Sequence, residues 1–281
     1  MENNLIYITF DSCRYDTFAA AKTPNMSRLG KAQRRYSYAS WTVPSHAVYL
    51  LGACPHTSPK GVFASEVYKK DFINWGARLN LPEISFKKFV PQLSLPYFLR
   101  QHGYKNGALV SLPVLNQTTV LNQHFDRYQL MAEHNNLDAM IDELKFEDGQ
   151  PWFYLLNTGE THYPYTLPGE SGEHLPRIHG MHGVFKHMDD MVLAGKTSGD
   201  IEEESEFFNM DQMLTLKEKQ RSNIEHLDGL IGKLFDIAPR NTHYIITSDH
   251  GELFGEDGYF GHGPVMHEKV FEVFFLEGTL K

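Results

Sequence analysis

Two short apolar runs, each followed at once by polar residues, constrain the fold of this chain more than any other feature. Residues 5–10 precede Asp11, and residues 243–247 lead to Asp249 and His250. Runs of this length, rich in aromatic and β-branched side chains, are typical of strands covered on both faces, as in a parallel sheet between layers of helices. Ligands bind at the carboxyl ends of such strands. We therefore expect Asp11, Asp249 and His250 to meet at one edge of an α/β sheet.

The rest of the chain continues the α/β pattern. Apolar spacing, prolines and glycines predict helices from near Pro44 to Gly52, over Leu95–His102 and over Asp211–Ile237, and strands over Gly107–Leu112, Trp152–Asn157 and Val270–Leu276. Residues 57–92 have no clean period, and residues 169–210 combine glycines, histidines and an acidic run. Such segments are long for plain loops, so we expect substrate-shaping insertions at about 57–92 and 160–210.

Composition narrows the class of protein. The 281 residues are 41% hydrophobic and 22% charged, which is ordinary for a globular protein. The net charge of −9, with no basic stretch to offset it, argues against a general nucleic-acid binder. Two cysteines cannot build a disulfide framework, and neither a signal pattern nor an apolar run of about 18 residues is present. We predict a soluble, cytoplasmic protein without a membrane partner.

Residues that can coordinate or activate follow four of the expected strands or loops. They are Asp11, Thr42, His162, and Asp249 with His250. A carboxylate beside an imidazole is an ordinary ligand pair for a divalent metal. Thr42 stands just ahead of the helix that begins near Pro44, where free N–H groups and the helix dipole favour an anion.

Five motifs occur in order along residues 5–263. They are the first strand with Asp11-Ser-Cys-Arg-Tyr-Asp16, then Thr23-Pro-Asn-Met-Ser-Arg-Leu29, Thr42-Val-Pro-Ser-His46, His162-Tyr-Pro-Tyr165, and Ser248-Asp-His-Gly-Glu252 with Gly261-His-Gly263. Together they resemble the sulfatase and phosphonate-hydrolase branch of the alkaline phosphatase superfamily. The resemblance implies an alkaline-phosphatase-like three-layer α/β/α sandwich with a mostly parallel central sheet. It would be a single domain over residues 1–281 that lacks the family's usual C-terminal subdomain.

The resemblance also implies a metal site and a nucleophile. Asp11, Asp249 and His250 would hold a divalent ion with Thr42 against it, and manganese, zinc, magnesium and calcium all suit such ligands. The acidified hydroxyl of Thr42 would attack phosphorus in line and form a phospho-threonine, which water would then hydrolyse.

Further roles follow from the same resemblance. His162 and His262 would bind non-bridging oxygens or protonate the leaving group. Glu252 would support these groups from outside the metal site. Apart from the resemblance, Arg14 could reach a substrate oxygen, and His46 is a second candidate for substrate binding.

Three departures from the family pattern bear on the chemistry. Sulfatases oxidise a cysteine or serine to an aldehyde, whereas Thr42 carries a methyl group on Cβ, so the same oxidation could give only a ketone. His46 replaces the arginine of the nucleophile motif, and Ser12 replaces a second acidic ligand. The changes at Thr42 and His46 favour phosphoryl or phosphonyl chemistry through a plain hydroxyl over sulfate esters.

The residues leave alternatives open. Asp11 also fits a turn that closes its strand. Thr42 also fits a cap for the following helix, with Ser40 and Ser45 as rival nucleophiles. Arg14 also fits a structural ion pair with its neighbour Asp16.

We expect a metal-dependent hydrolase of small phosphate or phosphonate esters. Three rival functions remain: a sulfatase without the aldehyde, a phosphotransferase that passes the covalent intermediate to an alcohol, and a non-catalytic protein that binds metal or anions. The transferase predicts more turnover with added alcohols, and the binding protein predicts binding without turnover.

Overall fold

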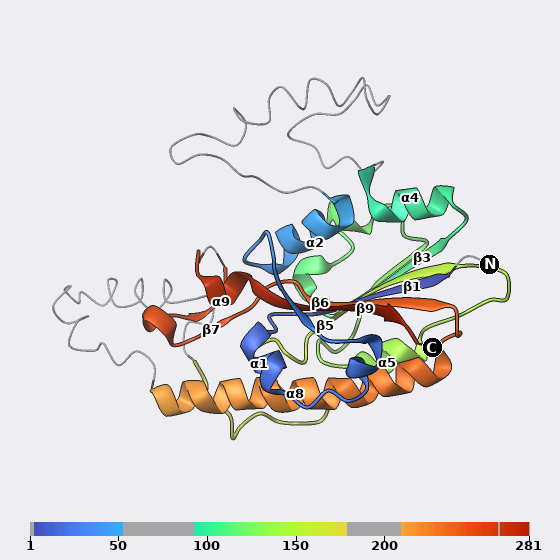
Figure 1. Cartoon of the computed structure of the whole chain (residues 1–281). Helices are drawn as coiled ribbons and strands as arrows, with labels where there is room; N and C mark the ends of the chain where they lie inside the picture. The colour runs from blue at the N-terminus through green and yellow to red at the C-terminus, as the bar shows by residue number, and fades with distance from the viewer. Residues whose placement is uncertain (1–2, 53–92, 179–208, 264, 281) are drawn as a thin grey trace, which may run out of the picture.

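A seven-stranded sheet forms the centre of the computed structural model, which describes residues 3–52, 93–178, 209–263 and 265–280 (Figure 1). Its strand order is β2-β9-β6-β1-β5-β3-β4. The strands are β1 (Asn4–Phe10), β2 (Gln33–Tyr36), β3 (Lys105–Val110), β4 (Arg127–Leu130), β5 (Trp152–Thr158), β6 (Thr242–Ser248) and β9 (Glu272–Thr279). Only β9 runs antiparallel to its neighbours, β6 and β2, so the sheet is mostly parallel.

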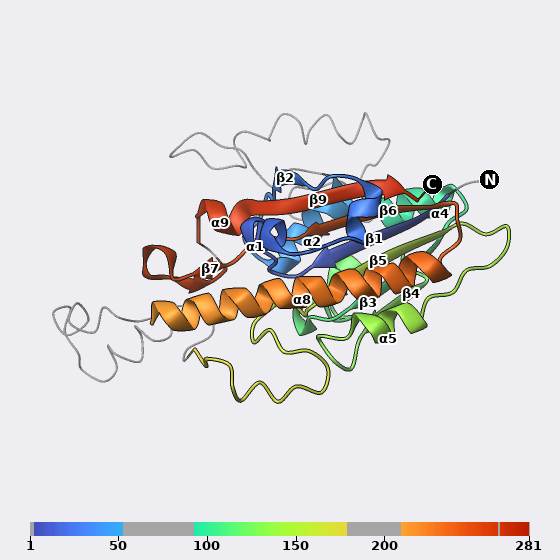
Figure 2. The ribbon, with the colours of Figure 1, turned by 60° about the horizontal axis from the view of Figure 1, so that its bottom comes forward.

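Helices cover both faces of this sheet (Figures 1 and 2). One face carries α2 (Thr42–Leu51) and α4 (Leu95–Gln101), and the other carries α1 (Tyr15–Ala20), α5 (Leu137–Asp142) and the long α8 (Met210–Ile237). In β1, Ile6 and Ile8 join the core under α8, while Leu5 and Tyr7 pack in the core under α2. This alternation is what a strand buried on both faces requires. The expected three-layer α/β/α arrangement is confirmed.

Register places the polar turns at one level. In the two parallel pairs around β1, Phe10 is opposite Thr158 of β5 and Ser248 of β6. Asp11 and Asp249 therefore leave the sheet side by side, and the loop after β5 starts next to them. A small sheet of β7 (Leu253–Phe254) and β8 (Phe260–Gly261) follows β6 and returns the chain to the same edge.

Most expected elements are present, with corrected bounds. The strand expected over Gly107–Leu112 is β3, which begins at Lys105 and ends at Val110. The strand expected over Val270–Leu276 begins only at Glu272, because His267 caps the short helix α9 (Glu268–Phe271) by accepting a hydrogen bond from the Lys269 N–H. Strand β2 was not expected, since its side chains are polar and exposed.

The two expected insertions are described only in part. Residues 57–92 and 179–208 lie outside the described residues, whereas residues 160–178 form a loop without helix or strand.

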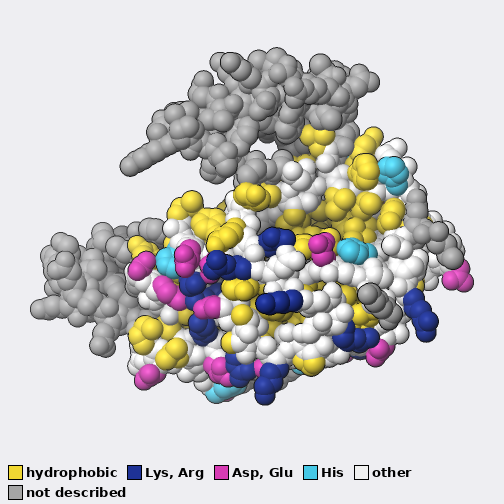
Figure 3. Space-filling view, in the orientation of Figure 1, with side chains coloured by type: hydrophobic (Ala, Val, Ile, Leu, Met, Phe, Trp, Pro, Cys, Tyr) yellow, Lys and Arg dark blue, Asp and Glu magenta, His cyan; other side chains and the backbone are white. Residues whose placement is uncertain are grey.

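On the face drawn in Figure 3, basic and acidic side chains are interspersed. Within the described part of the chain, no helix is both long and apolar enough to cross a bilayer.

The Thr23–Leu29 motif serves to anchor the chain to α8. Its short 3-10 helix, η1 (Met26–Leu29), is held by Asp228, whose carboxylate accepts hydrogen bonds from the Met26 N–H at 2.8 Å and from the Asn25 N–H and Nδ2 at 3.0 Å. Asp228 is buried. The carboxylate therefore satisfies backbone donors that have no other partner in this turn.

We predict that Asp228→Ala lowers the free energy of unfolding by about 3 kcal/mol, because buried N–H groups lose a charged acceptor. Urea unfolding followed by circular dichroism measures the change. Asp236→Ala, at an exposed position of the same helix, controls for the loss of an acidic helix residue and should change the free energy by less than about 0.5 kcal/mol. Equal losses in the two variants would contradict the anchoring role.

Candidate metal centre and active site

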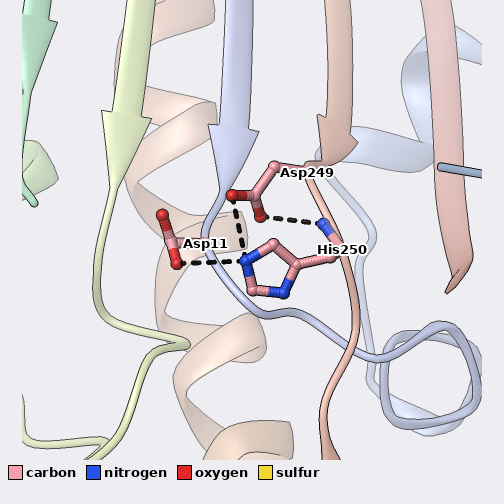
Figure 4. Close-up of side chains that lie close together, drawn as sticks. All are labelled: Asp11, Asp249 and His250. Atoms are coloured by element: carbon pink, nitrogen blue, oxygen red, sulfur yellow. Dashed lines mark hydrogen bonds and ion pairs between the residues drawn. The ribbon is translucent and has the colours of Figure 1, made fainter. Parts of the chain in front are cut away.

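Asp11, Asp249 and His250 meet at the carboxyl ends of β1 and β6 (Figure 4). One ligand atom from each residue lies within 4.8 Å of the others, and all three side chains are buried. His250 Nε2 is 3.3 Å from Asp249 Oδ2 and 3.9 Å from Asp11 Oδ1. The fold thus brings Asp11 together with Asp249 and His250, which lie more than 200 positions further along the chain. This is the meeting expected from the ends of the two strands.

Backbone and amide donors hold one oxygen of each carboxylate. Asp249 Oδ1 accepts hydrogen bonds from the N–H groups of Ser12 at 3.1 Å and His250 at 2.9 Å. Its Oδ2 is buried and has no hydrogen-bond partner among the described residues. Asp11 Oδ2 accepts a hydrogen bond from Asn157 Nδ2 at 3.0 Å. The other oxygens, Asp249 Oδ2 and Asp11 Oδ1, are the two that approach His250.

The ring of His250 is oriented to offer a lone pair. Its Nδ1 donates to the carbonyl of Gly251 at 2.9 Å, so the hydrogen is on Nδ1 and Nε2 is free to coordinate. Burial lowers the pKa of His250 to about 3, which keeps the ring neutral. Gly251 is required here, because a Cβ atom would lie 2.1 Å from the Lys269 carbonyl oxygen.

The charges of the two carboxylates call for a cation. Burial and the charge of Asp11 raise the pKa of Asp249 well above its usual value. Burial opposes ionisation of Asp11 too, but nearby imidazoles and the Asn157 amide lower its pKa. Two buried carboxylates without a counter-ion are unfavourable, and one of them has an unpartnered oxygen aimed at an imidazole lone pair. This donor set fits a divalent metal ion.

The Thr42 hydroxyl lies at the same centre. Oγ1 is 3.4 Å from both Asp11 Oδ1 and His250 Nε2 and is buried. Thr42 is the first residue of α2, with Trp41 as the N-cap, so it stands one position further into the helix than expected. Its hydroxyl contacts the site and does not cap the helix. The hydroxyl of the rival Ser45 instead donates to the Asp249 carbonyl at 2.9 Å.

His162 and His262 border the centre. The His262 ring centroid is 4.3 Å from that of His250 and 5.4 Å from that of His162. His162 Nδ1 donates to the Tyr163 carbonyl at 2.7 Å. Gly261 and Gly263, with φ angles of 94° and 121°, adopt conformations that favour glycine. Both imidazoles therefore lie on the His250 side of the centre, and their expected catalytic roles stay predictions.

Arg14 and His46, the two residues expected to contact the substrate, both make hydrogen bonds within the protein. Each side-chain nitrogen of Arg14 has a carboxylate partner: Nε and Nη2 bond to Asp16, and Nη1 bonds to Glu256. The ion pair expected between Arg14 and Asp16 is thus present, and a substrate contact of Arg14 stays a prediction. His46 lies one turn into α2 and donates from Nδ1 to the Thr42 carbonyl at 2.9 Å, and within the described part of the chain its Nε2 has no hydrogen-bond partner. Its role in substrate binding stays a prediction.

Two neighbours of Asp11 make contacts that the sequence did not predict. Asn157 is the next-to-last residue of β5, and its place as the polar residue that ends the apolar run of residues 152–157 was the available signal. Ser12 has a positive φ of 59° and donates from Oγ to Asp11 Oδ1 at 3.2 Å. Its Oγ is also 3.3 Å from His262 Nδ1, so Ser12 joins the two sides of the centre.

Solved structures share this architecture. The C-terminal periplasmic domain of EptC from Escherichia coli, in complex with Zn, has a TM-score of 0.59 and 14% identity over 100% of this chain and 73% of its own. The phosphonate monoester hydrolase of Agrobacterium radiobacter has a TM-score of 0.58 and 13% identity over 99% and 68%. The 2-O GAG sulfatase BT1596 has a TM-score of 0.58 and 10% identity over 100% and 66%.

The chain has the fold of the alkaline phosphatase superfamily. At these identities the likeness establishes the fold. No family model and no curated protein matches the sequence. The resemblance read from the motifs is thereby confirmed at the level of architecture.

We predict that Asp249→Asn has opposite effects with and without metal. In metal-free protein it should raise the free energy of unfolding by about 1–2 kcal/mol, because it removes a buried like-charge repulsion. It should also weaken Mn²⁺ or Zn²⁺ binding by more than the about 10–100-fold that follows loss of a residue supporting a ligand. Urea unfolding after chelation and isothermal titration calorimetry measure the two effects.

The matched control for this metal prediction is Asp148→Asn, at an exposed acidic position. It should change neither quantity. Unaltered metal affinity in Asp249→Asn would remove Asp249 from the centre.

A second buried carboxyl lies behind the loop after β5. Glu160 accepts a hydrogen bond from the Leu137 N–H at the start of α5 at 2.7 Å and one from the Thr158 hydroxyl. Burial raises its pKa to about 7. Because the folded pKa exceeds the unfolded one, the favourable contribution of Glu160 is complete below the unfolded pKa and is lost as the pH rises towards 7.

We predict that Glu160→Gln removes this loss. The stability of the variant relative to wild type should increase by about 3 kcal/mol between pH 4.5 and pH 7.5. Urea unfolding at a series of pH values measures the difference. A difference that stays constant with pH would contradict the raised pKa.

Proposed function

We propose that this protein is a metal-dependent hydrolase of phosphate or phosphonate esters that acts through Thr42. The observation that carries the proposal is the buried Thr42 hydroxyl, 3.4 Å from both Asp11 Oδ1 and His250 Nε2. A hydroxyl beside a metal-binding cluster and at a helix N-terminus is suited to nucleophilic attack on an anionic ester. The substrate is a small molecule.

A divalent ion held by Asp11, Asp249 and His250 would lower the pKa of the Thr42 hydroxyl and offset charge on the phosphoryl oxygens. The Thr42 hydroxyl gives up its proton to solvent, and its oxygen forms a bond to phosphorus as the bond to the ester oxygen breaks. The departing oxygen takes a proton from His162 or His262. Water then attacks the phospho-threonine, which releases phosphate or phosphonate and restores the hydroxyl.

The start of α2 supports the same reaction. Thr42 is its first residue and no side chain caps the N-terminus, so backbone N–H groups remain available to non-bridging oxygens. Donors fixed in the folded chain stabilise developing charge without reorganisation.

Phosphorus esters are favoured over sulfate esters. Thr42 carries a methyl group on Cβ and so lacks the route to an aldehyde that cysteine and serine have. Among the structural neighbours, the phosphonate monoester hydrolase of Agrobacterium radiobacter is named for this class of ester. The metal is manganese, zinc, magnesium or calcium, and the Zn complex of the EptC domain supports zinc as the first to test.

A phosphotransferase is the second candidate. The phosphoethanolamine transferase EptC from Campylobacter jejuni is also a structural neighbour, with 11% identity and a TM-score of 0.56. A transferase would use the same phospho-threonine and deliver its group to an alcohol in place of water. Added acceptor alcohols would then increase turnover and yield the transferred ester.

The proposal extends to the domain organisation of the protein and to its location in the cell. We infer a single domain over residues 1–281 and a cytoplasmic location. Cys13 is a free, buried thiol, which is compatible with a reducing compartment.

We predict that nitrophenyl phosphate mono- and diesters or phosphonates are hydrolysed when one of the four metals is supplied, with sulfates slower. Thr42→Ala should lower kcat by about 10³-fold or more, because the nucleophile is lost. Thr42→Ser should retain turnover and form a phospho-serine. Steady-state assays and mass spectrometry of quenched protein measure these outcomes.

Thr118→Ala is the matched control for the Thr42 prediction, because it removes the hydroxyl of an exposed threonine distant in sequence from Thr42. Full activity of Thr42→Ala would exclude the nucleophile. Preference for sulfates would favour a sulfatase. Tight metal binding without turnover of any ester, and with binding unchanged in Thr42→Ala, would favour a non-catalytic protein.

A further inference from the structure

A buried chain of hydrogen bonds runs from Tyr165 through Glu252 to His262. Glu252 Oε1 is 3.0 Å from His262 Nδ1, and the Tyr165 hydroxyl donates to Glu252 Oε2. Glu252 is 1% exposed and Tyr165 is fully buried. Both oxygens of this buried carboxylate therefore have a partner, which is the condition for its being retained in the interior.

The tyrosine end of this chain is fixed by packing. The Tyr165 ring lies in a cluster with Met213 and Leu216 of α8 and with Phe254 and Phe260 of the small sheet. Its carbonyl accepts a hydrogen bond from Asn223 Nδ2 at 2.7 Å.

A backbone hydrogen bond links Tyr165 to His162. The Tyr165 N–H donates to the His162 carbonyl at 2.8 Å. One short motif thus supplies both an imidazole of the site and the hydroxyl that supports the other imidazole.

The carboxylate determines which nitrogen of His262 carries a hydrogen. An ionised carboxylate only accepts hydrogen bonds, so Nδ1 must donate to Glu252. Nε2 is then the nitrogen left for a ligand. The His262 side chain is 19% exposed, whereas that of Glu252 is 1% exposed, so solvent or substrate reaches the ring and not the carboxylate.

Glu252 is outside the metal cluster. Among the described residues, the only group of acidic, histidine or cysteine side chains close enough to hold an ion is Asp11, Asp249 and His250. Both oxygens of Glu252 are used by His262 and Tyr165.

We propose that Glu252 and Tyr165 are positioning residues that keep the Nδ1–H of His262 hydrogen-bonded to Glu252, so that Nε2 carries the proton that passes to the leaving-group oxygen and the ring is left with its hydrogen on Nδ1. This inference rests on the proposed hydrolysis for its kinetic consequence. The ring orientation itself is independent of turnover. Loss of the Tyr165 hydroxyl leaves Oε2 without its donor and lets the carboxylate move away from Nδ1.

Nitrogen NMR of histidine-labelled protein tests the orientation without substrate. The His262 resonances, identified by their loss in His262→Gln, should show a hydrogen on Nδ1 in the wild-type protein. Tyr165→Phe and Glu252→Gln should shift them towards a mixture of tautomers. Resonances that are unchanged in both variants would overturn the proposal.

Leaving-group dependence tests the kinetic role. Tyr165→Phe should lower kcat by about 10–100-fold for alkyl esters, whose leaving oxygen needs a proton, and by less than about threefold for nitrophenyl esters. KM should change little. Glu252→Gln should show the same pattern. A merely structural role would reduce turnover of all esters equally, and that result would overturn the proposal.

Tyr244→Phe is the matched control, because Tyr244 is a buried tyrosine in β6 away from the site. Its loss of a hydroxyl should leave the leaving-group dependence unchanged. If the wild-type protein hydrolyses none of the esters, the proposed function fails while the NMR experiment still decides the positioning of His262. Turnover by the wild type with a uniform loss in Tyr165→Phe fails the positioning alone.

Discussion

The parallel pairing of β1 with β6 places two buried carboxylates against each other, and the rest of the centre depends on this pairing. Because Phe10 is opposite Ser248, Asp11 and Asp249 leave the sheet at the same level. Backbone and amide donors hold one oxygen of each carboxylate. The oxygens that remain converge on the lone pair of His250, and a cation is the group that suits three such donors at once.

The strongest sequence signals identified the parts of the fold that build this centre. Nearly continuous apolar runs predicted β1, β5 and β6, because strands buried on both faces are mostly apolar and do not alternate with polar residues. Helical spacing predicted α8 to within one residue at its start. Since parallel strands align their carboxyl ends, the residues following these runs were candidates for a shared site before their distances were known.

Other features depended on contacts that no local pattern contains. Arg14 and Glu256 are 242 positions apart, so only the folded chain shows that the guanidinium is already paired. Strand β2 is exposed along its whole length and is defined by its pairing with β9. The hydrogen bond from Tyr165 to Glu252 joins two motifs that read separately as a turn and a metal loop.

An acidic protein with a proposed anionic substrate needs a local reversal of charge. The carboxylates of Asp11 and Asp249 belong to the metal cluster and are negative themselves. Burial lowers the pKa of His262. Its hydrogen bond with Glu252 and the charges of Glu252 and Asp11 have the larger, opposite effect, so the pKa lies above its usual value. Arg14, in contrast, is neutralised by its own carboxylates. The positive charge available to the proposed phosphoryl group would therefore come from a bound ion, the imidazoles and the start of α2, all of which lie at the edge of one sheet.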